Sequence, residues 1–482
     1  MMNAKQYVES LRKLNMEVYF QGERIENPVD HPAIRPHVNA AAETYEMAFD
    51  PDTEDLVSTT SHLTGEKINR FTHIHQNTDD LIKQVKMLRA ISQKTGTCYQ
   101  RCVGHDGLNA LYSITYEMDD ELGTEYHTRF VNFLKYIQET DFMCDGAMTD
   151  PKGDRSLSPS QQADPDLYLR IVERRSDGII VSGAKAHQTG AVNSHEIVVM
   201  PTTAMGPDDA DYAVAFSVPS DSKGLFYIFG RQTNDGRKME GDMDIGNPVY
   251  GTVGGEALAI FENVFVPNDR IFMCGEHQWA GTLVERFASY HRQRYGGCRG
   301  GWADVLIGAT VAIAEQSGTD KASHVRDKIV EMTHLAETIY CGSLACSVEG
   351  QPTPSGACWV DPLLANTTKL NVTRHIYEIC RLAHDIAGGM LATLPAEKDF
   401  VSERTGPYIE KYFKGKADVP TEHRIRIARL IENMTSGTPL VESMHGAGSP
   451  QAQKIGILRL ANLQGKKDLA LKLAGIKKVG ED

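Results

Sequence analysis

The spacing of hydrophobic residues changes twice along this 482-residue chain, and the two changes limit the folds that it can adopt. From about residue 38 to 147, and again beyond about residue 276, apolar residues recur every three or four positions, as on one face of an α-helix. In between, short runs alternate apolar and polar residues, as half-buried β-strands do. The pattern predicts an α+β protein with an N-terminal helical domain (1–147), a middle β domain (148–275) and a C-terminal helical bundle (276–482).

The strongest strand signal is "DLYLRIVERRSDGIIVSGAKA", where two alternating runs meet at Asp177-Gly178, a pair typical of β-hairpin turns. Further strand-like runs follow in "HEIVVMP", "DYAVAFSVP", "GLFYIFGRQ" and "EALAIFENVFVP". We find no convincing strand signal between residues 38 and 147. The long amphipathic segments after residue 300 need neighbouring helices to cover their apolar faces, which predicts a bundle.

Composition argues against several classes of protein. The formal net charge of -14 disfavours an extended nucleic-acid-binding surface, because phosphate binding requires clustered Lys and Arg. No run reaches the ~18 apolar residues of a membrane span, and the N-terminus lacks the basic-then-apolar pattern of a signal peptide. We therefore expect a cytoplasmic protein without nucleic-acid or membrane partners.

Nine cysteines, an odd number in a long chain without an export signal, indicate thiols rather than a disulfide framework. In "KTGTCYQRCVGHDG", Cys98 and Cys102 stand four apart, which predicts that both thiols share one face of a helix. In "SYHRQRYGGCRGG", His291 and Cys298 are seven residues apart. If the two segments meet, three thiolates and one imidazole would suit either zinc or an iron–sulfur cluster, and spacing does not choose between them.

The second cysteine segment is rich in glycine. We expect Gly296 and Gly297 to let the chain turn tightly enough for the histidine and cysteine on either side to reach the same group. The other cysteines lie mostly in apolar settings, so we expect them to pack in the core; they are Cys144, Cys274, Cys341, Cys346, Cys358 and Cys380.

Two polar segments flank the first strand-like runs and could accept a cofactor. In "CDGAMTDPKGDRS", Lys152 and Arg155 could meet a phosphate or the edge of a flavin ring. In "GAKAHQTGAVNSHE", His187, Gln188 and Thr189 are donors beside small residues, which leaves room for a planar cofactor. No G-x-G-x-x-G motif opens a βαβ unit, so a Rossmann site is disfavoured.

A third polar segment, "VESMHGAGSPQAQK", places Glu442 and His445 beside two glycines after a long helix. The pair could cap a helix end or act as an acid and a base. The pattern alone favours neither function.

Several of these motifs resemble those of a known family. The order helix, β domain, helix bundle, with "GAKAHQTG", "VFVPNDRIFM" and "DIAGG", resembles the acyl-CoA dehydrogenase-like flavoproteins of the 4-hydroxyphenylacetate 3-monooxygenase group. Within that group, "TCYQRCVG", "AMTDPKGDRS", "SYHRQRYGGC" and "ESMHGAGSPQAQ" are similar to the 4-hydroxybutyryl-CoA dehydratase family, and the resemblance covers nearly the whole chain.

The resemblance implies a fold, cofactors and an activity. The fold would be acyl-CoA dehydrogenase-like, with a β-barrel-like middle domain, and the protein would be a homotetramer that binds FAD and a [4Fe-4S] cluster. The reaction, associated with anaerobic fermentation, would be the radical dehydration of 4-hydroxybutyryl-CoA to crotonyl-CoA. The same enzyme would isomerise vinylacetyl-CoA to crotonyl-CoA.

The resemblance also assigns residues by their matching positions. The cluster ligands would be Cys98, Cys102, His291 and Cys298, and the catalytic residues would be Glu442, His291, Tyr295, Glu256 and Thr189. The cofactor-binding residues would be Gln100, Met148, Thr149, Lys152, Asp154, Arg155, Ser156, Gln188, Thr189, Arg299 and Ala447. The chain departs from the family at Arg299, where lysine is expected, and in "SERTGPYIEKYF", which replaces a longer connection.

Two other functions remain open from the residues alone. One is a flavin-dependent aromatic monooxygenase of the same fold, which needs no metal cluster and would leave the two cysteine segments without a purpose. The other is a CoA-binding protein stabilised by zinc on the same four ligands.

Overall fold

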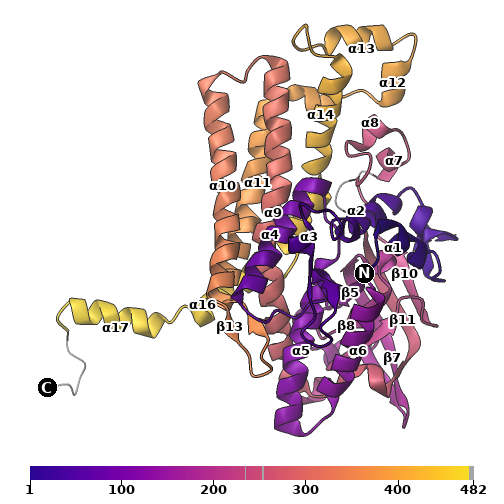
Figure 1. Cartoon of the computed structure of the whole chain (residues 1–482), viewed down its shortest axis with the longest axis vertical. Coiled ribbons are helices and arrows are strands. Elements are labelled where there is room, and N and C mark those ends of the chain that lie inside the picture. The colour runs from indigo at the N-terminus through magenta and orange to yellow at the C-terminus, as the bar shows by residue number, and fades with distance from the viewer. Residues whose placement is uncertain (234, 252–253, 477–482) are drawn as a thin grey trace.

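Two β-sheets and a bundle of long helices make up most of the molecule, with the sheets beside α5 and α6 and the bundle standing next to them (Figure 1). The computed structural model describes residues 1–233, 235–251 and 254–476. The long helices are α4 (Thr78–Thr95), α5 (Cys102–Leu122), α6 (Tyr126–Thr140), α9 (His277–Ser317), α10 (Ser323–Val348), α11 (Pro362–Ala387) and α14 (Thr421–Met434). Shorter helices are α1 (Ala4–Leu11), α2 (Arg35–Glu46), α3 (Glu54–Val57), α7 (Asp235–Lys238), α8 (Asp242–Ile245), α12 (Glu397–Val401), α13 (Gly406–Tyr412), α15 (Gly437–His445), α16 (Pro450–Leu460) and α17 (Leu463–Leu473).

The larger sheet has six strands in the order β2-β1-β10-β11-β7-β6, and the smaller has four in the order β12-β9-β8-β5. Their bounds are β1 Glu17–Phe20, β2 Glu23–Ile25, β5 Cys144–Ala147, β6 Arg170–Arg174, β7 Gly178–Thr189, β8 Glu196–Val199, β9 Val214–Pro219, β10 Leu225–Phe229, β11 Glu256–Pro267 and β12 Ile271–Cys274. The predicted hairpin is confirmed: β6 and β7 are antiparallel, and the amide of Arg175 donates to the carbonyl of Gly178 at 2.8 Å across the turn.

The sheets also contain strands from the N-terminal segment, where we expected helices alone. β1 pairs in parallel with β10, β5 pairs in parallel with β8, and a small hairpin joins β3 (Ser58–Thr60) to β4 (Lys67–Asn69). Strands of three or four residues are too short to establish an alternating pattern, so periodicity does not reveal them. Among the described strands both sheets have open ends, whereas a barrel-like domain was expected.

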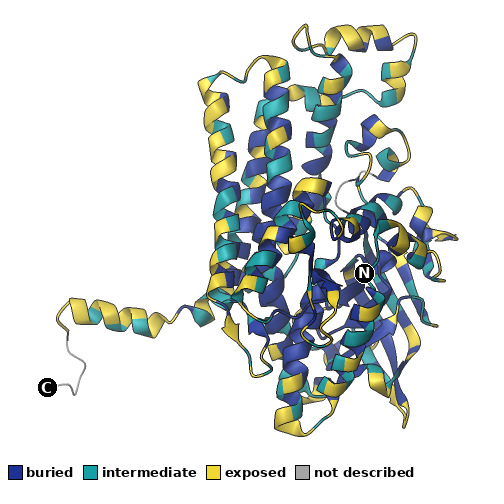
Figure 2. Cartoon of the chain, viewed as in Figure 1, coloured by how far each residue is buried: buried dark blue, intermediate teal, exposed yellow. Residues whose placement is uncertain are grey.

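The helical bundle forms around α9, α10, α11 and α14, whose apolar faces share one core (Figure 1). Trp302 and Leu306 of α9 pack there with Ile339 of α10, Ile376 of α11 and Ile431 of α14. Among the described residues no helix has both the length and the apolar character needed to cross a membrane. The helical periodicity of the C-terminal segments is therefore confirmed. These helices bury their apolar faces against one another and leave their outer faces exposed (Figure 2).

The glycine-rich segment is not a turn, which corrects our expectation. α9 runs without interruption through Gly296 and Gly297, and both glycines are buried. A Cβ at Gly296 would collide with Ser343 and the Ile339 carbonyl of α10, and one at Gly297 would lie 2.7 Å from the Val85 carbonyl of α4. The missing side chains therefore let α9 approach its two neighbours closely.

Candidate active site

The three predicted ligand cysteines come from two segments of the chain. Cys98 lies in the loop between α4 and α5, Cys102 is the first residue of α5, and Cys298 lies in the middle of α9. The expectation that Cys98 and Cys102 share one helix face is therefore wrong, because the helix begins only at the second of them. His291 lies two turns before Cys298, on the same side of α9.

These three cysteines differ in exposure from most of the others. Cys98, Cys102 and Cys298 keep part of their surface accessible, although they lie in the interior. The expectation of core packing holds for four of the remaining cysteines, which are buried: Cys144, Cys346, Cys358 and Cys380. It is wrong for Cys341, which is exposed on the outer side of α10, and only partly met by Cys274.

Cys102 and Cys298 pack against the same apolar cluster, which includes Tyr99, the residue after Cys98. Burial raises the pKa of Cys298 to about 11. Burial also raises the pKa of Cys102, with further contributions from Asp106 and Cys298, and it raises the pKa of Cys98, with contributions from Glu442 and Cys102. Thiols held neutral by burial become thiolate ligands only beside a strong positive charge, such as a bound metal supplies.

The residues around the thiols fit an iron–sulfur cluster. Three soft thiol donors with one imidazole form a set that such clusters use. The buried polar atoms Tyr99 Oη, Gln100 Oε1 and Arg299 Nε have no hydrogen-bond partner among the described residues. Those residues contain no three His, Cys, Asp or Glu side chains close enough to share a single metal ion. A cubane cluster binds its ligands through four different irons and so requires donors that stand further apart.

A compact group of polar side chains lies where the turns of α9 after His291 approach α15. Arg299 Nη2 forms an ion pair with Glu442 Oε2 of α15 at 2.8 Å, and the Tyr295 hydroxyl donates to the Glu442 carbonyl at 3.4 Å. The edge of the Tyr295 ring meets the His291 ring, with 5.4 Å between centroids. A Cβ at Gly446 would collide with the Tyr295 hydroxyl, so the small residue after α15 permits this approach. The structure thus brings four of the predicted residues together.

Two further predicted residues face each other where the central strands meet the bundle. Glu256, the first residue of β11, pairs with Thr189, the last residue of β7. Burial, together with the nearby Glu442 carboxylate, raises the pKa of Glu256 to about 7. Arg299 forms an ion pair with Glu442, whereas Glu256 holds its proton through most of the range below neutrality.

Gln100 joins the cysteine loop to these strands. Its backbone has a φ of 61°, its side chain is fully buried, and its amide nitrogen donates to the Gly254 carbonyl. A Cβ at Gly190 would lie only 2.8 Å from the Gln100 carbonyl oxygen. The loop that carries Cys98 therefore packs directly against the ends of β7 and β11.

The segment predicted to hold the cofactor divides into two parts. The Met148 carbonyl accepts a hydrogen bond from Lys185 Nζ at 3.0 Å, and the Thr149 carbonyl accepts from the Gln188 side chain at 3.1 Å, which ties this half to β7. The other half is exposed; it comprises Lys152, Asp154, Arg155 and Ser156. Ala447 lies apart from both, after α15, with a φ of 58° and its carbonyl bound to Arg292 at 3.0 Å.

Sequence reasoning missed Lys369, which lies in the middle of α11 and is completely buried. Its ammonium donates to the Ser443 carbonyl at 2.6 Å and lies 4.3 Å from the centre of the Tyr295 ring. Burial, with Arg299 and Arg292 nearby, lowers the pKa of Lys369 to about 7. No motif surrounds this lysine in the sequence, so only the packing of α11 against α15 and α9 reveals it.

Asp106 and Arg294 were also missed. His291 Nδ1 lies 2.7 Å from Asp106 Oδ2, and Arg294 forms an ion pair with the other oxygen of the same carboxylate. Asp106 follows Cys102 by four residues and Arg294 follows His291 by three, so both spacings were available in the sequence. A search of the helix faces around each predicted ligand would have found them.

Comparison with known proteins gives a consistent result over the whole chain. Residues 3–273 match the family described as 4-hydroxyphenylacetate 3-hydroxylase N terminal, and residues 280–475 match its C-terminal counterpart. The chain is 57% identical to 4-hydroxybutyryl-CoA dehydratase/vinylacetyl-CoA-Delta-isomerase of Clostridium aminobutyricum over 99% of this chain and 100% of that protein. It is 52% identical to an oxygen-tolerant archaeal 4-hydroxybutyryl-CoA dehydratase from N. maritimus, with a TM-score of 0.97 over 100% of this chain and 96% of the other.

More distant structures share the fold alone. The oxygenase component of 4-hydroxyphenylacetate 3-monooxygenase, complexed with FAD, is 21% identical, with a TM-score of 0.87 over 98% of each chain. Glutaryl-coenzyme A dehydrogenase is 12% identical, with a TM-score of 0.52 over 99% of this chain and 97% of the other. The mixed helix-and-sheet architecture is therefore acyl-CoA dehydrogenase-like, as the sequence predicted.

Proposed function

Because the chain belongs to the 4-hydroxyphenylacetate 3-hydroxylase family, and within it to the 4-hydroxybutyryl-CoA dehydratases, we propose that it dehydrates 4-hydroxybutyryl-CoA to crotonyl-CoA and isomerises vinylacetyl-CoA. One observation carries the proposal: Cys102 and Cys298, which come from distant segments, pack against one cluster around Tyr99, next to the third partly accessible cysteine, Cys98. An aromatic monooxygenase of this fold needs no such set of thiols.

The proposed cofactors are FAD and a [4Fe-4S] cluster. Cys98, Cys102, Cys298 and His291 would hold the cluster, and the loop at Met148 and Thr149 with the end of β7 would hold the flavin. When bound, the flavin supplies one-electron chemistry and the cluster supplies a Lewis acid for the departing hydroxyl. Thr189→Val tests the flavin position, since an unchanged flavin spectrum and an unchanged reduction behaviour would show that Thr189 does not contact the ring.

The reaction needs more proton transfers than an ordinary elimination. One proton leaves C2 and one leaves C3, hydroxide leaves C4 and takes up one proton as water, and C4 gains the other. No net oxidation results. The C3 hydrogen of a saturated thioester is not acidic, so residues that accept and return protons must lie around one cavity together with the cofactors.

Glu442 is the proposed base for the C2 proton. Its side chain lies 2.8 Å from Arg299, and a carboxylate is the form of the group that accepts a proton. Glu256, whose pKa is raised to about 7 by burial and by Glu442, would hold a proton beside it. Tyr295 would donate a hydrogen bond to the leaving oxygen, and His291 would take part in proton transfer only when its nitrogen is not bound to iron.

The proposed substrates are CoA thioesters, and the proposed assembly is a homotetramer. Both follow from the family to which the chain belongs. The unusual Arg299 keeps the positive charge that a lysine would provide, and its planar fork meets the Glu442 carboxylate at 2.8 Å. We therefore assign this position to charge balance.

The deciding experiment uses protein purified without oxygen. Iron, acid-labile sulfide, zinc and flavin are measured per subunit, and 4-hydroxybutyryl-CoA is supplied as substrate. We expect about four irons and four sulfides, with bound FAD and crotonyl-CoA as product. A flavoprotein without iron that hydroxylates phenols would be a monooxygenase, and a zinc protein without turnover would be a binding protein.

A further inference from the structure

His291 is held by a carboxylate that has no solvent contact. Asp106, on the second turn of α5, is completely buried and places Oδ2 2.7 Å from His291 Nδ1. A carboxylate oxygen in this position accepts a hydrogen bond from the Nδ1–H of the ring, which leaves Nε2 with its lone pair. Among the described residues no hydrogen bond to Nε2 is present.

Arg294 pairs with this carboxylate in the interior. It lies one turn after His291 on α9, is almost completely buried, and forms an ion pair with the second oxygen of Asp106. Because a buried carboxylate is costly without a charged partner, Arg294 supports Asp106 in its place beside the imidazole. His291, Asp106 and Arg294 form what we call the inner triad.

The inner triad is anchored at its far side by a second histidine. Arg294 Nη2 lies 3.0 Å from His105 Nδ1, and since arginine only donates, this nitrogen of His105 must accept. His105 Nε2 then carries the proton and donates to the His73 carbonyl at 2.6 Å. The donor and the acceptor are therefore assigned in each contact from the His73 carbonyl back to Arg294.

We infer that Asp106 and Arg294 are positioning residues that hold His291 in the Nδ1-protonated form and direct Nε2 toward Cys102 and Cys298. The helices make this arrangement possible, because Cys102 and Asp106 lie four apart on α5 while His291, Arg294 and Cys298 lie on one side of α9. Partners of this kind orient metal-binding imidazoles and raise their basicity. The inference rests on the proposed function, since it assumes that His291 binds iron.

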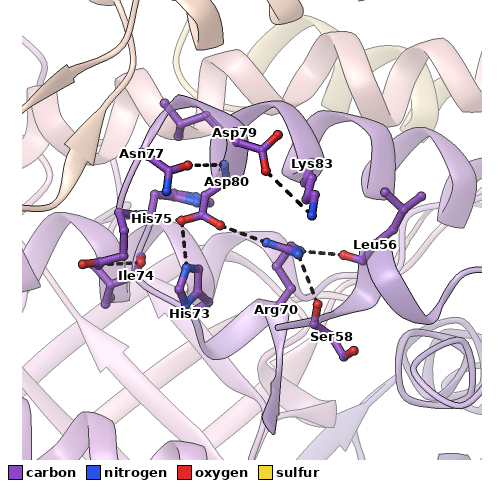
Figure 3. A network of polar contacts seen from close by, with 12 residues as sticks. Leu56, Ser58, Arg70, His73, Ile74, His75, Asn77, Asp79, Asp80 and Lys83 are labelled. Carbon is purple, nitrogen blue, oxygen red and sulfur yellow. Dashed lines mark hydrogen bonds and ion pairs between the residues drawn. The ribbon is translucent and has the colours of Figure 1, made fainter. Parts of the chain in front are cut away.

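A matched control lies nearby on the same chain. Asp80 also lies between a histidine and an arginine, at 3.0 Å from His73 Nε2 and 3.3 Å from Arg70 Nη1 (Figure 3). We call His73, Asp80 and Arg70 the outer triad. Its histidine is not a proposed ligand, so Asp80→Asn removes the same kind of charge without touching His291.

The test compares Asp106→Asn, Asp80→Asn and the parent enzyme, all purified without oxygen. Iron and flavin per subunit, the rate of iron release to a ferrous chelator, and the nitrogen hyperfine coupling of the reduced cluster are measured. We expect Asp106→Asn to keep its flavin, to release iron about ten times faster or more, and to change the nitrogen coupling. Asp80→Asn should match the parent in all three cluster measurements.

Parent-like iron release and an unchanged nitrogen coupling in Asp106→Asn would overturn the inference while leaving the proposed function intact. An equal acceleration in Asp80→Asn would also overturn it, since the effect would then be general. A parent enzyme without iron would overturn both. If Asp106→Asn does not fold, Asp106→Glu displaces the carboxylate by one methylene and keeps its charge. That variant should also release iron faster, and parent-like release would contradict the inference.

Discussion

The inner and outer triads use the same three residue types at similar distances, and yet their surroundings differ. In the outer triad, Arg70 also donates to the carbonyls of Leu56 at 2.6 Å and Ser58 at 3.1 Å, so its donors satisfy the backbone where α3 ends and β3 begins (Figure 3). The inner triad has thiols and a glutamate–arginine pair nearby. A buried His–Asp–Arg group therefore indicates chemistry only when the groups beyond its histidine are themselves reactive.

The largest difference between the surroundings of the inner triad and those of the outer triad should follow from removing a thiol near the inner triad. Cys298→Ala should lose its iron and nearly all turnover of 4-hydroxybutyryl-CoA, because loss of a Lewis acid costs several kcal/mol, or about a thousandfold. Cys346→Ala, at a buried cysteine of α10, should keep both iron and turnover. Iron analysis and product formation measure this, and a Cys298→Ala enzyme with a full complement of iron would contradict the ligand assignment.

The next largest effect should come from replacing Glu442, the proposed base near the inner triad. Glu442→Gln should retain iron and flavin and lower turnover about 100- to 10,000-fold, since a positioned base contributes that much. Exchange of the C2 and C3 hydrogens with deuterated water should slow in parallel. Exchange at the parent rate in a folded variant would show that Glu442 is not the base and would make His291 the leading candidate.

A substitution in the outer triad should lower the stability of the protein rather than its activity. Asp80→Asn leaves the almost completely buried Arg70 without its carboxylate partner, which should destabilise the protein by about 3 kcal/mol. Turnover of the remaining folded enzyme should stay within about twofold of the parent. Urea unfolding and kinetics on the same sample measure the two quantities. A large loss of turnover at unchanged stability would mean that the outer triad contributes to catalysis.

The free energy of unfolding should depend on pH with opposite signs through Glu256, near the inner triad, and through Asp80, in the outer triad. Burial and Glu442 raise the pKa of Glu256 to about 7, so its contribution to stability is complete below its ordinary range and is lost as the pH rises through neutrality. Against the effect of burial, the hydrogen bond from His73 lowers the pKa of Asp80, so its contribution is lost as the pH falls below its ordinary range. Each slope is at most ~1.4 kcal/mol per pH unit.

Substitution tests these signs one at a time. Glu256→Gln should flatten the decline in unfolding free energy between about pH 5 and 7, and Asp80→Asn should leave that decline in place. Urea unfolding at several pH values provides the measurement. A decline that persists in Glu256→Gln would place the neutral-range titration on another group.

The smallest effect should follow from restoring the family's lysine. If Arg299 only balances the charge of Glu442, then Arg299→Lys keeps that charge and should change turnover less than tenfold, or ~1.4 kcal/mol in the barrier. Steady-state kinetics with 4-hydroxybutyryl-CoA measure the change. A hundredfold gain would show that the position acts as a compact contact or a proton donor.

Much of the fold could be predicted because it depends on local patterns. The Asp177-Gly178 hairpin and the long helices each follow from residues that are adjacent or one turn apart. The strands β1 and β5 could not be predicted in this way, since they are short and are stabilised by β10 and β8, which lie far along the sequence. Pairing between distant strands leaves no periodic signal in either one.

The candidate site was predictable in its residue types but not in its geometry. Cysteine and histidine are uncommon enough to be noticed, and the resemblance placed Glu256 and Glu442 among the active residues. Lys369 gave no signal, because an isolated lysine in a helix is ordinarily a solvated side chain. Only its burial beneath α15 makes it part of the site.

Local spacing and residue type were sufficient to predict the long helices, the strands β6 to β11, the hairpin and the cysteine and histidine donors, because each depends on neighbouring residues or on the chemistry of one side chain. The tertiary structure alone decided which cysteines keep accessible surface and which become core. It also decided that Gly296 and Gly297 serve close packing of α9 rather than a turn, and that Asp106 reaches His291. These features arise where helices distant in sequence pack together, and burial and proximity are properties of that packing, not of any segment alone.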